Sequence, residues 1–288
     1  MLGNALPADD RVRYEVMPFP RAEREAAQTA GPLTLTVTCS PRHGIDATLD
    51  VAERLRALGH RVVPHLAARM VRDRRHLDAI LARLADLDAD EVFLVGGDAA
   101  AAAGPFASGE RLLPLLREHP RGPRTIGVPA YPEGHPAIPE EVLRSSLAAK
   151  APWADYAVTQ ICFDPGALLG WLARTRDAGI ELPLYVGVPG AVDRRRLVGI
   201  ALRVGVGASV RTLRRQQGMR RLMRRPASPA APLLAAIDPL VGGDDGVRGY
   251  HVFTFNDLVG SVRELPAARA VAVAPPRRRD RPSLSTGG

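Results

Sequence analysis

Residues 125–136 read TIGVPAYPEGHP, and this stretch combines the two features on which the fold prediction depends. Its first half is apolar and strand-like, and it ends abruptly at a cluster that contains Tyr131, Glu133 and His135. The two prolines and the glycine of this cluster hold an irregular backbone that ordinary strand or helix residues would not adopt. Polar side chains on a stiff loop after a buried strand are placed to meet a ligand. A plain turn is the alternative interpretation.

The chain has 288 residues, of which 46% are hydrophobic and 24% are charged. This size favours one large globular domain, and an α/β barrel reaches it undivided. No apolar run approaches the roughly 18–20 residues that cross a bilayer, and the start of the chain lacks the apolar core of a signal peptide. Cys39 and Cys162 lie in or beside apolar runs, which indicates reduced thiols in a cytoplasmic protein. Because no Cys-x-x-Cys or His-Glu-x-x-His spacing occurs, we expect no metal site.

The net charge of +8 comes mainly from arginine, which is concentrated in residues 211–225 and 277–281. Such clusters raise the possibility of nucleic-acid binding. However, aromatic residues make up only 5% of the chain and do not alternate with the arginines, as base-stacking surfaces require. We therefore expect a solvated basic surface and an attraction for anionic small molecules rather than nucleic acid.

Strand-like and helical runs alternate along the chain. The expected strands begin at Tyr14 and then cover 33–39, 61–65, 91–95, 125–130, 156–161, 184–188 and 249–254. The expected helices cover 21–28, 46–58, 73–87, 108–119, 139–150, 165–178, 193–203, about 208–224, 230–241 and 256–264. Eight strands alternating with helices predict a single-domain (β/α)8 TIM barrel with extra helices before the last strand. A doubly wound sheet is less favoured, because no Gly-x-Gly-x-x-Gly follows the first strand.

Within this prediction the barrel occupies residues 14–265. Residues 1–13 form a polar lead-in, and the proline- and arginine-rich composition of 266–288 predicts a disordered tail.

Polar residues stand at the carboxyl ends of successive predicted strands: Glu15, Thr38, His65, Asp98, Tyr131, Gln160 and Thr254. In a (β/α)8 barrel this rim is where active sites are built. Each residue has a structural alternative, such as a helix cap for Asp98 or a buried core imidazole for His65. Their joint placement at one end of the fold favours a ligand site.

The sequence stretches around these residues resemble motifs of the methylenetetrahydrofolate reductase family, in the same order and at approximately the same spacing, from Tyr14 to Asn256. Residues 130–136 match the family's AYPEGHP fully, and residues 14–21 are similar to its FEFFPPR. Residues 159–164, TQICFD, resemble TQLFFD, and residues 251–256, HVFTFN, resemble HFYTLN.

The resemblance implies reduction of 5,10-methylenetetrahydrofolate to 5-methyltetrahydrofolate. Glu15 would be the general acid that protonates N10, and Asp98 would stabilise the resulting N5 iminium cation and bind the pterin. Burial at a strand end is expected to raise the pKa of Glu15 enough to retain a proton near neutral pH. The other implied substrate-binding residues are Thr38, Gln160 and Phe163. The implied cofactor-binding residues are His65, Gly97, Ala130, Tyr131, His135 and Lys150.

Several positions that the family uses for FAD differ in this chain. Gly96 stands where the family has arginine, Phe106 stands where tyrosine is usual, and of the flavin-facing helix only Lys150 clearly survives. Each lost charge-assisted hydrogen bond removes roughly 1.5–3 kcal/mol of binding free energy. We therefore expect a flavin-independent reductase that takes hydride directly from NADH or NADPH. A reductase that retains FAD and a folate-binding barrel without activity are the alternatives, and the sequence makes no prediction of oligomeric state.

Overall fold

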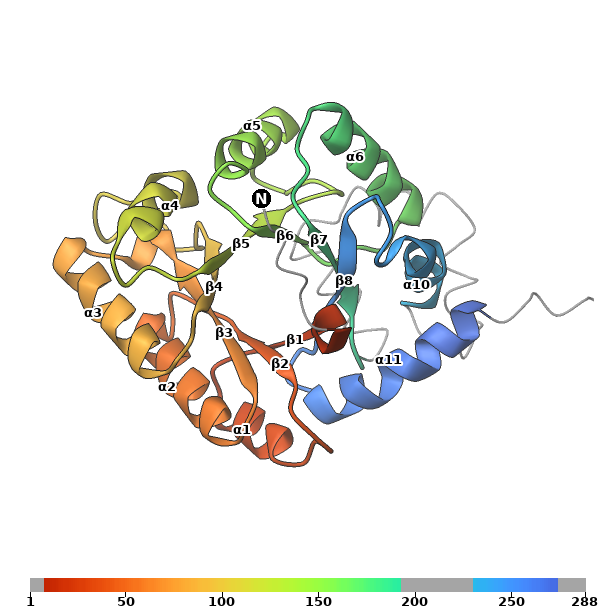
Figure 1. Cartoon of the computed structure of the whole chain (residues 1–288), viewed down its shortest axis with the longest axis horizontal. Helices are drawn as coiled ribbons and strands as arrows, with labels where there is room; N and C mark the ends of the chain where they lie inside the picture. Colours follow the sequence, from red (N-terminus) through yellow and green to blue (C-terminus); the bar gives the residue numbers. More distant parts are fainter. Residues whose placement is uncertain (1–7, 193–229, 274–288) are drawn as a thin grey trace, which may run out of the picture.

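The structure, a computed structural model, describes residues 8–192 and 230–273. Eight parallel strands form a closed barrel in chain order, and the barrel closes where β1 pairs with β8 (Figure 1). The strands are β1 (Val12–Val16), β2 (Thr34–Val37), β3 (Arg61–Ala67), β4 (Glu91–Val95), β5 (Thr125–Ala130), β6 (Tyr156–Thr159), β7 (Leu184–Pro189) and β8 (Val247–Phe253). The predicted single-domain (β/α)8 barrel is therefore confirmed.

Helices surround the barrel as an outer ring (Figure 1). They are α1 (Pro20–Ala26), α2 (Gly44–Ala57), α3 (Arg74–Asp86), α4 (Gly109–Glu118), α5 (Glu140–Lys150), α6 (Pro165–Asp177), α10 (Ala231–Ile237) and α11 (Leu258–Val273). Short 3-10 turns occur at η1 (Ala8–Arg11), η2 (Ala68–Met70) and η3 (Asp238–Leu240). None of the described helices is long and apolar enough to cross a membrane.

Local sequence explains where several helices begin and end. The carboxylate of Asp73 accepts a hydrogen bond from the His76 amide (2.7 Å) and so caps the start of α3. Asp164 caps α6 in the same way, accepting from the Gly166 amide at 2.9 Å. Gly59 follows α2 with φ +90°, a conformation that favours glycine and ends the helix.

The chain departs from the predicted domain limits at both ends. β1 begins at Val12 and is preceded by η1, and the side chains of Asp10 and Arg13, which were assigned to the polar lead-in, are buried. They can be buried because they pair with each other. At the other end α11 continues to Val273, beyond the predicted boundary at 265, because the alanine-rich sequence that follows favours helix. The helices predicted at 193–203 and 208–224 lie outside the described residues.

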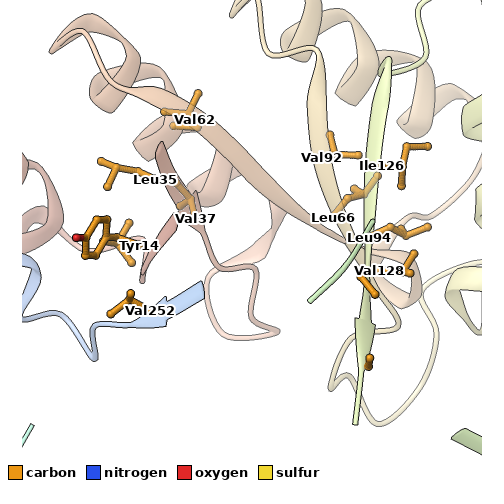
Figure 2. Close-up of a cluster of buried hydrophobic side chains, with 14 of the residues drawn as sticks. Tyr14, Leu35, Val37, Val62, Leu66, Val92, Leu94, Ile126, Val128 and Val252 are labelled. Carbon is orange, nitrogen blue, oxygen red and sulfur yellow. The ribbon is translucent and has the colours of Figure 1, made fainter. Parts of the chain in front are cut away.

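Strand side chains pack alternately outward against the helices and inward into the barrel. The outward set includes Tyr14, Leu35, Val62, Leu94 and Val128, and Figure 2 shows these side chains along β1 to β5. The interior is filled by a second cluster: Val63, Phe93, Tyr156, Val158 and Tyr185. Because both faces are covered, the strands are apolar along most of their length.

Charged side chains close the amino end of the barrel. The fully buried Arg13 lies 2.5 Å from Glu91 Oε1 and 2.8 Å from Asp10 Oδ2. The aromatic rings of Tyr156 and Tyr185 flank its guanidinium at 4.4 and 4.0 Å. This end is filled by paired charge and aromatic rings, which leaves the carboxyl end of the barrel for a ligand.

Candidate active site at the carboxyl end of the barrel

All eight strands are parallel, so their carboxyl ends meet at one mouth of the barrel. The structure places every polar residue predicted at a strand end on this side. Glu15 and His65 lie within β1 and β3, and the others follow directly or within three residues of a strand: Thr38, Asp98, Tyr131, Gln160 and Thr254. These residues do not all lie at the same depth in the barrel. Glu15 and His65 reach into the barrel interior, whereas Asp98 is exposed on the rim.

The Glu15 carboxyl lies between two buried histidines. Its Oε2 atom is 3.2 Å from His251 Nε2 and 4.0 Å from His65 Nε2. The two imidazoles are 1% and 6% exposed, whereas 19% of the Glu15 side chain is exposed. Glu15 is therefore an acid that is enclosed from below and accessible from the mouth. His251 was not among the predicted site residues, although it begins the HVFTFN stretch that carried the family resemblance.

The ionisation of this cluster differs from the prediction for Glu15. Burial raises the pKa of the carboxyl, but the hydrogen bond and charge of His251, together with the charge of His65, lower it below its ordinary value. Burial also lowers the pKa of His65 to about 4, so this ring is neutral near pH 7. The hydrogen bond with His251 is therefore the main contact that lowers the pKa of Glu15, and the expectation of a raised pKa was wrong.

Aromatic rings surround the acid. His65 packs on Phe93 with centroids 4.8 Å apart, and His251 contacts Phe253 edge-to-face at 5.0 Å. Phe253 in turn stacks with Phe255 at 6.4 Å and 26°. Flat apolar surfaces beside a single carboxyl suit a planar heterocycle that must receive a proton. Neither Phe253 nor Phe255 was predicted, because aromatic residues near a strand end are equally common in a core.

A second group on the rim comes from the loops after β4 and β5. Burial raises the pKa of Tyr131, and the charge of Asp98 raises it further, which shows that the two residues are close. Tyr131 also contacts His135 edge-to-face, with centroids 5.4 Å apart. Gly97 has φ +95°, and a Cβ there would lie 3.0 Å from the Ala67 Cβ. The backbone at Gly97 thus holds the loop that presents Asp98 close against the end of β3.

The loop after β6 carries Gln160 and Phe163, both partly buried. The Gln160 side-chain oxygen accepts a hydrogen bond from the Ile161 amide (2.9 Å), so this oxygen of a predicted substrate-binding residue is already engaged. Glu133 Oε1 accepts from the Phe163 and Asp164 amides at 2.5 and 2.8 Å. This glutamate of the AYPEGHP stretch therefore ties the β5 loop to the β6 loop, a role that sequence reasoning did not assign.

Two further predicted residues, Thr38 and Thr254, form hydrogen bonds with the backbone of β1. Thr38 donates its amide to the Val16 carbonyl at 2.9 Å. The hydroxyl of the fully buried Thr254 donates to the Glu15 carbonyl at 2.5 Å. Both contacts hold neighbouring strand ends at the mouth. Among the described residues, no group of three or more His, Cys, Asp or Glu side chains could hold a metal ion.

Three of the predicted cofactor residues, Ala130, Tyr131 and Lys150, line a cavity of about 860 Å³ beside α5 and α6. Lys150 is only 7% exposed, and burial lowers the pKa of its amine against the opposing charge of Glu110. The charged side chains around the cavity are five acids and three bases: Glu133, Glu140, Glu141, Asp164, Asp177, Arg144, Lys150 and Arg174. Two of the bases face acids of the same cavity, Arg144 with Glu141 and Arg174 with Glu140. This lining does not fit a dinucleotide pyrophosphate, which carries negative charge.

Known proteins are similar to this chain in sequence or in fold. The sequence model of the family described as methylenetetrahydrofolate reductase matches residues 17–192, more than half of the chain. Methylenetetrahydrofolate reductase 1 of Schizosaccharomyces pombe is 31% identical over 86 residues, which are 29% of this chain and 14% of the relative. Methylenetetrahydrofolate reductase 2 of Saccharomyces cerevisiae is 27% identical over 92 residues, which are 30% and 15%. The chain therefore matches only a small part of the length of these relatives.

A solved structure is similar over nearly the whole chain. It is an uncharacterized protein from Clostridium thermocellum that binds two copies of 5-methyl-5,6,7,8-tetrahydrofolic acid. The similarity covers 91% of this chain and 93% of that one, with a TM-score of 0.56 and 11% sequence identity. At this identity the comparison supports the barrel fold alone.

Proposed function

The chain belongs to the methylenetetrahydrofolate reductase family, and we propose that it reduces 5,10-methylenetetrahydrofolate to 5-methyltetrahydrofolate with hydride taken directly from NADH or NADPH. The observation that carries the proposal is the Glu15 carboxyl, enclosed by His65 and His251 and open to the barrel mouth. Protonation of the substrate at N10 by Glu15 opens its five-membered ring and leaves an iminium cation at N5. The methylene carbon of this cation then accepts the hydride.

The rim supports a folate as the substrate. Asp98 offers a carboxylate near Tyr131 that would stabilise the cation, and Phe163 and Gln160 stand on the next loop to bind the pterin. The Clostridium protein of the same fold binds 5-methyltetrahydrofolic acid, which favours the same class of ligand here. A folate-binding barrel without activity has no use for a proton donor between two histidines.

We propose that no flavin relays the hydride. The acidic lining of the cavity at Lys150 does not suit the FAD pyrophosphate, and Phe106, in place of the family's tyrosine, is buried in the core. The nicotinamide is then a second substrate that binds at the mouth beside the folate. Purified protein should oxidise NADH in the presence of methylenetetrahydrofolate at the same rate with and without added FAD. A stoichiometric bound flavin that supports turnover would show that the relay is retained.

The first test of the reaction is the substitution Glu15→Gln, which keeps the size of the side chain but removes the transferable proton. We expect loss of turnover by a factor of at least ~10², with folate affinity changed by no more than a few-fold. Glu118→Gln removes one exposed carboxyl at the end of α4 and serves as the control with full activity. Normal turnover by the Glu15 variant would show that another group is the acid.

A further inference from the structure

We propose that His251 is a positioning residue that holds the Glu15 carboxyl and stores the proton that Glu15 passes to the substrate. This inference rests on the proposed function, in which Glu15 protonates the folate. It answers a difficulty that the structure creates. An acid catalyst must hold a proton, yet the surroundings of Glu15 favour its ionised form. A proton stored on an adjacent group resolves this conflict.

The contacts of His251 point to this role. Its Nε2 atom lies 3.2 Å from Glu15 Oε2, and the ring is 1% exposed. Its other nitrogen, Nδ1, is buried and has no hydrogen-bond partner among the described residues. A buried imidazole normally satisfies both nitrogens, since an unpaired buried polar atom costs roughly 1–3 kcal/mol. Here the Glu15 contact orients the ring, and the cost of the unpaired nitrogen indicates a function at this position.

Few other groups compete for the same proton. The second titratable group that faces Glu15 is His65 of β3, at 4.0 Å and without a hydrogen bond. Three register partners carry no ionisable side chain: Thr36 lies opposite Glu15 on β2, Gly187 lies opposite His251 on β7, and Phe93 lies opposite His65 on β4. Arg13 is the register partner of His251 on β1, and its guanidinium pairs with Glu91 and Asp10. The Glu15–His251 pair is therefore the local proton reservoir.

The proton transfer uses the contact between the two side chains, from His251 Nε2 to Glu15 Oε2. With the proton on His251, Glu15 begins the step ionised. The His251 Nε2–H bond breaks as the Glu15 Oε2–H bond forms, which makes Glu15 a neutral acid. The Oε2–H bond then breaks as the N10–H bond of the folate forms. One proton leaves the imidazolium and one arrives on the substrate, so the step balances without any further reactant.

The experiment follows the ionisation of Glu15 directly, in protein labelled with carbon-13 at the glutamate carboxyls. Glu15→Gln assigns the resonance by its disappearance. In His251→Phe the ring volume remains but the donor is lost, so burial is opposed only by the weaker effect of His65 on the carboxyl. We expect its titration midpoint to move to higher pH than in the unsubstituted protein. His65→Phe is the matched control, and it should shift the midpoint less because His65 makes no hydrogen bond to Glu15.

A second variant separates holding from proton storage. His251→Gln keeps an N–H donor but does not titrate, so it should return the Glu15 resonance toward the original titration. In NADH oxidation both His251 variants should lose a factor of about 10 or more in kcat with little change in folate affinity. Only His251→Gln should keep the hydrogen bond to the Glu15 carboxyl, and therefore a Glu15 titration close to that of the unsubstituted protein. An unchanged Glu15 titration in His251→Phe, or full activity in both variants, would overturn the inference. Because the titration needs no substrate, it gives its answer even if the protein proves not to be a reductase.

Discussion

Arg13 shows how much one residue contributes to the barrel. Its side chain is fully buried, with two carboxylates and two tyrosine rings around it. The favourable interactions offset the desolvation of a guanidinium only while all partners are present. Its Nε atom has no hydrogen-bond partner among the described residues, so the two carboxylates and the two rings carry the whole compensation for burying the guanidinium.

Arg13→Met should therefore lower the free energy of unfolding by about 3–5 kcal/mol, because Glu91 and Asp10 would remain buried with only the partly exposed Arg61 as a neighbouring cation. Urea unfolding followed by circular dichroism measures this change. Arg61→Met is the matched control: Arg61 contacts the same Glu91 at 2.6 Å, but its side chain is 36% exposed. We expect that substitution to cost no more than about 1 kcal/mol. Equal costs for the two variants would contradict the account of Arg13 as the buried centre of the cluster.

At the scale of elements, the loops after β5 and β6 depend on each other through Glu133. One carboxylate oxygen accepts hydrogen bonds from two amides at the end of the β6 loop, directly before α6, and Asp164 of that loop caps α6. The rim at this side is thus a connected unit of two loops and a helix start. Rigidity here matters for the proposed function, since Phe163 and Gln160 lie on the same segment.

Glu133→Ala should free the amides of Phe163 and Asp164. We expect faster hydrogen exchange in a peptide that covers 160–167, and a loss of roughly 1–3 kcal/mol in the free energy of unfolding, because hydrogen bonds to a charged acceptor are removed. Mass spectrometry of the exchanged peptide measures the first effect. Glu140→Ala, on the same cavity but with only a 3.9 Å contact to Arg174, should leave that peptide unchanged. Similar exchange in both variants would mean that Glu133 does not hold the loop.

At the scale of the whole molecule, buried histidines make the fold sensitive to acid. Burial lowers the pKa of His65 to about 4 and also lowers that of His60. The unfolded chain binds these protons near pH 6.5, well before the folded protein does. The contribution of His65 to stability is therefore complete above about pH 6.5 and is lost as the pH falls toward 4.

We expect the free energy of unfolding to decrease between pH 6.5 and 4, with a slope of up to about 1.4 kcal/mol per pH unit from His65 alone. His65→Leu should reduce that slope, because the titrating group is removed from the apolar contact with Phe93. Urea unfolding at a series of pH values gives the slope. His135→Leu, on the β5 loop, is the control for the substitution itself. An undiminished slope in the His65 variant would show that other groups dominate the response to acid.

Local patterns in the sequence were sufficient for the architecture. The strands at 91–95 and 125–130 have the predicted limits, and the caps at Asp73 and Gly59 lie where helix boundaries were expected. Strand periodicity, caps and turns are properties of neighbouring residues, so they can be recognised without knowing the fold. The parallel arrangement then places Glu15, His65 and Asp98 at one end of the barrel.

The chemistry of the site required the closed barrel. His251 and Glu15 are 236 residues apart in sequence, and they meet because β8 closes against β1. Arg13 on β1 and Glu91 on β4 are 78 residues apart in sequence, and they pair inside the closed barrel. No local pattern encodes these pairings, so sequence reasoning assigned Arg13 to a polar lead-in and expected a raised pKa for Glu15. The direction of that pKa depends on burial competing with a neighbouring imidazole, and only the tertiary structure brings the two groups together.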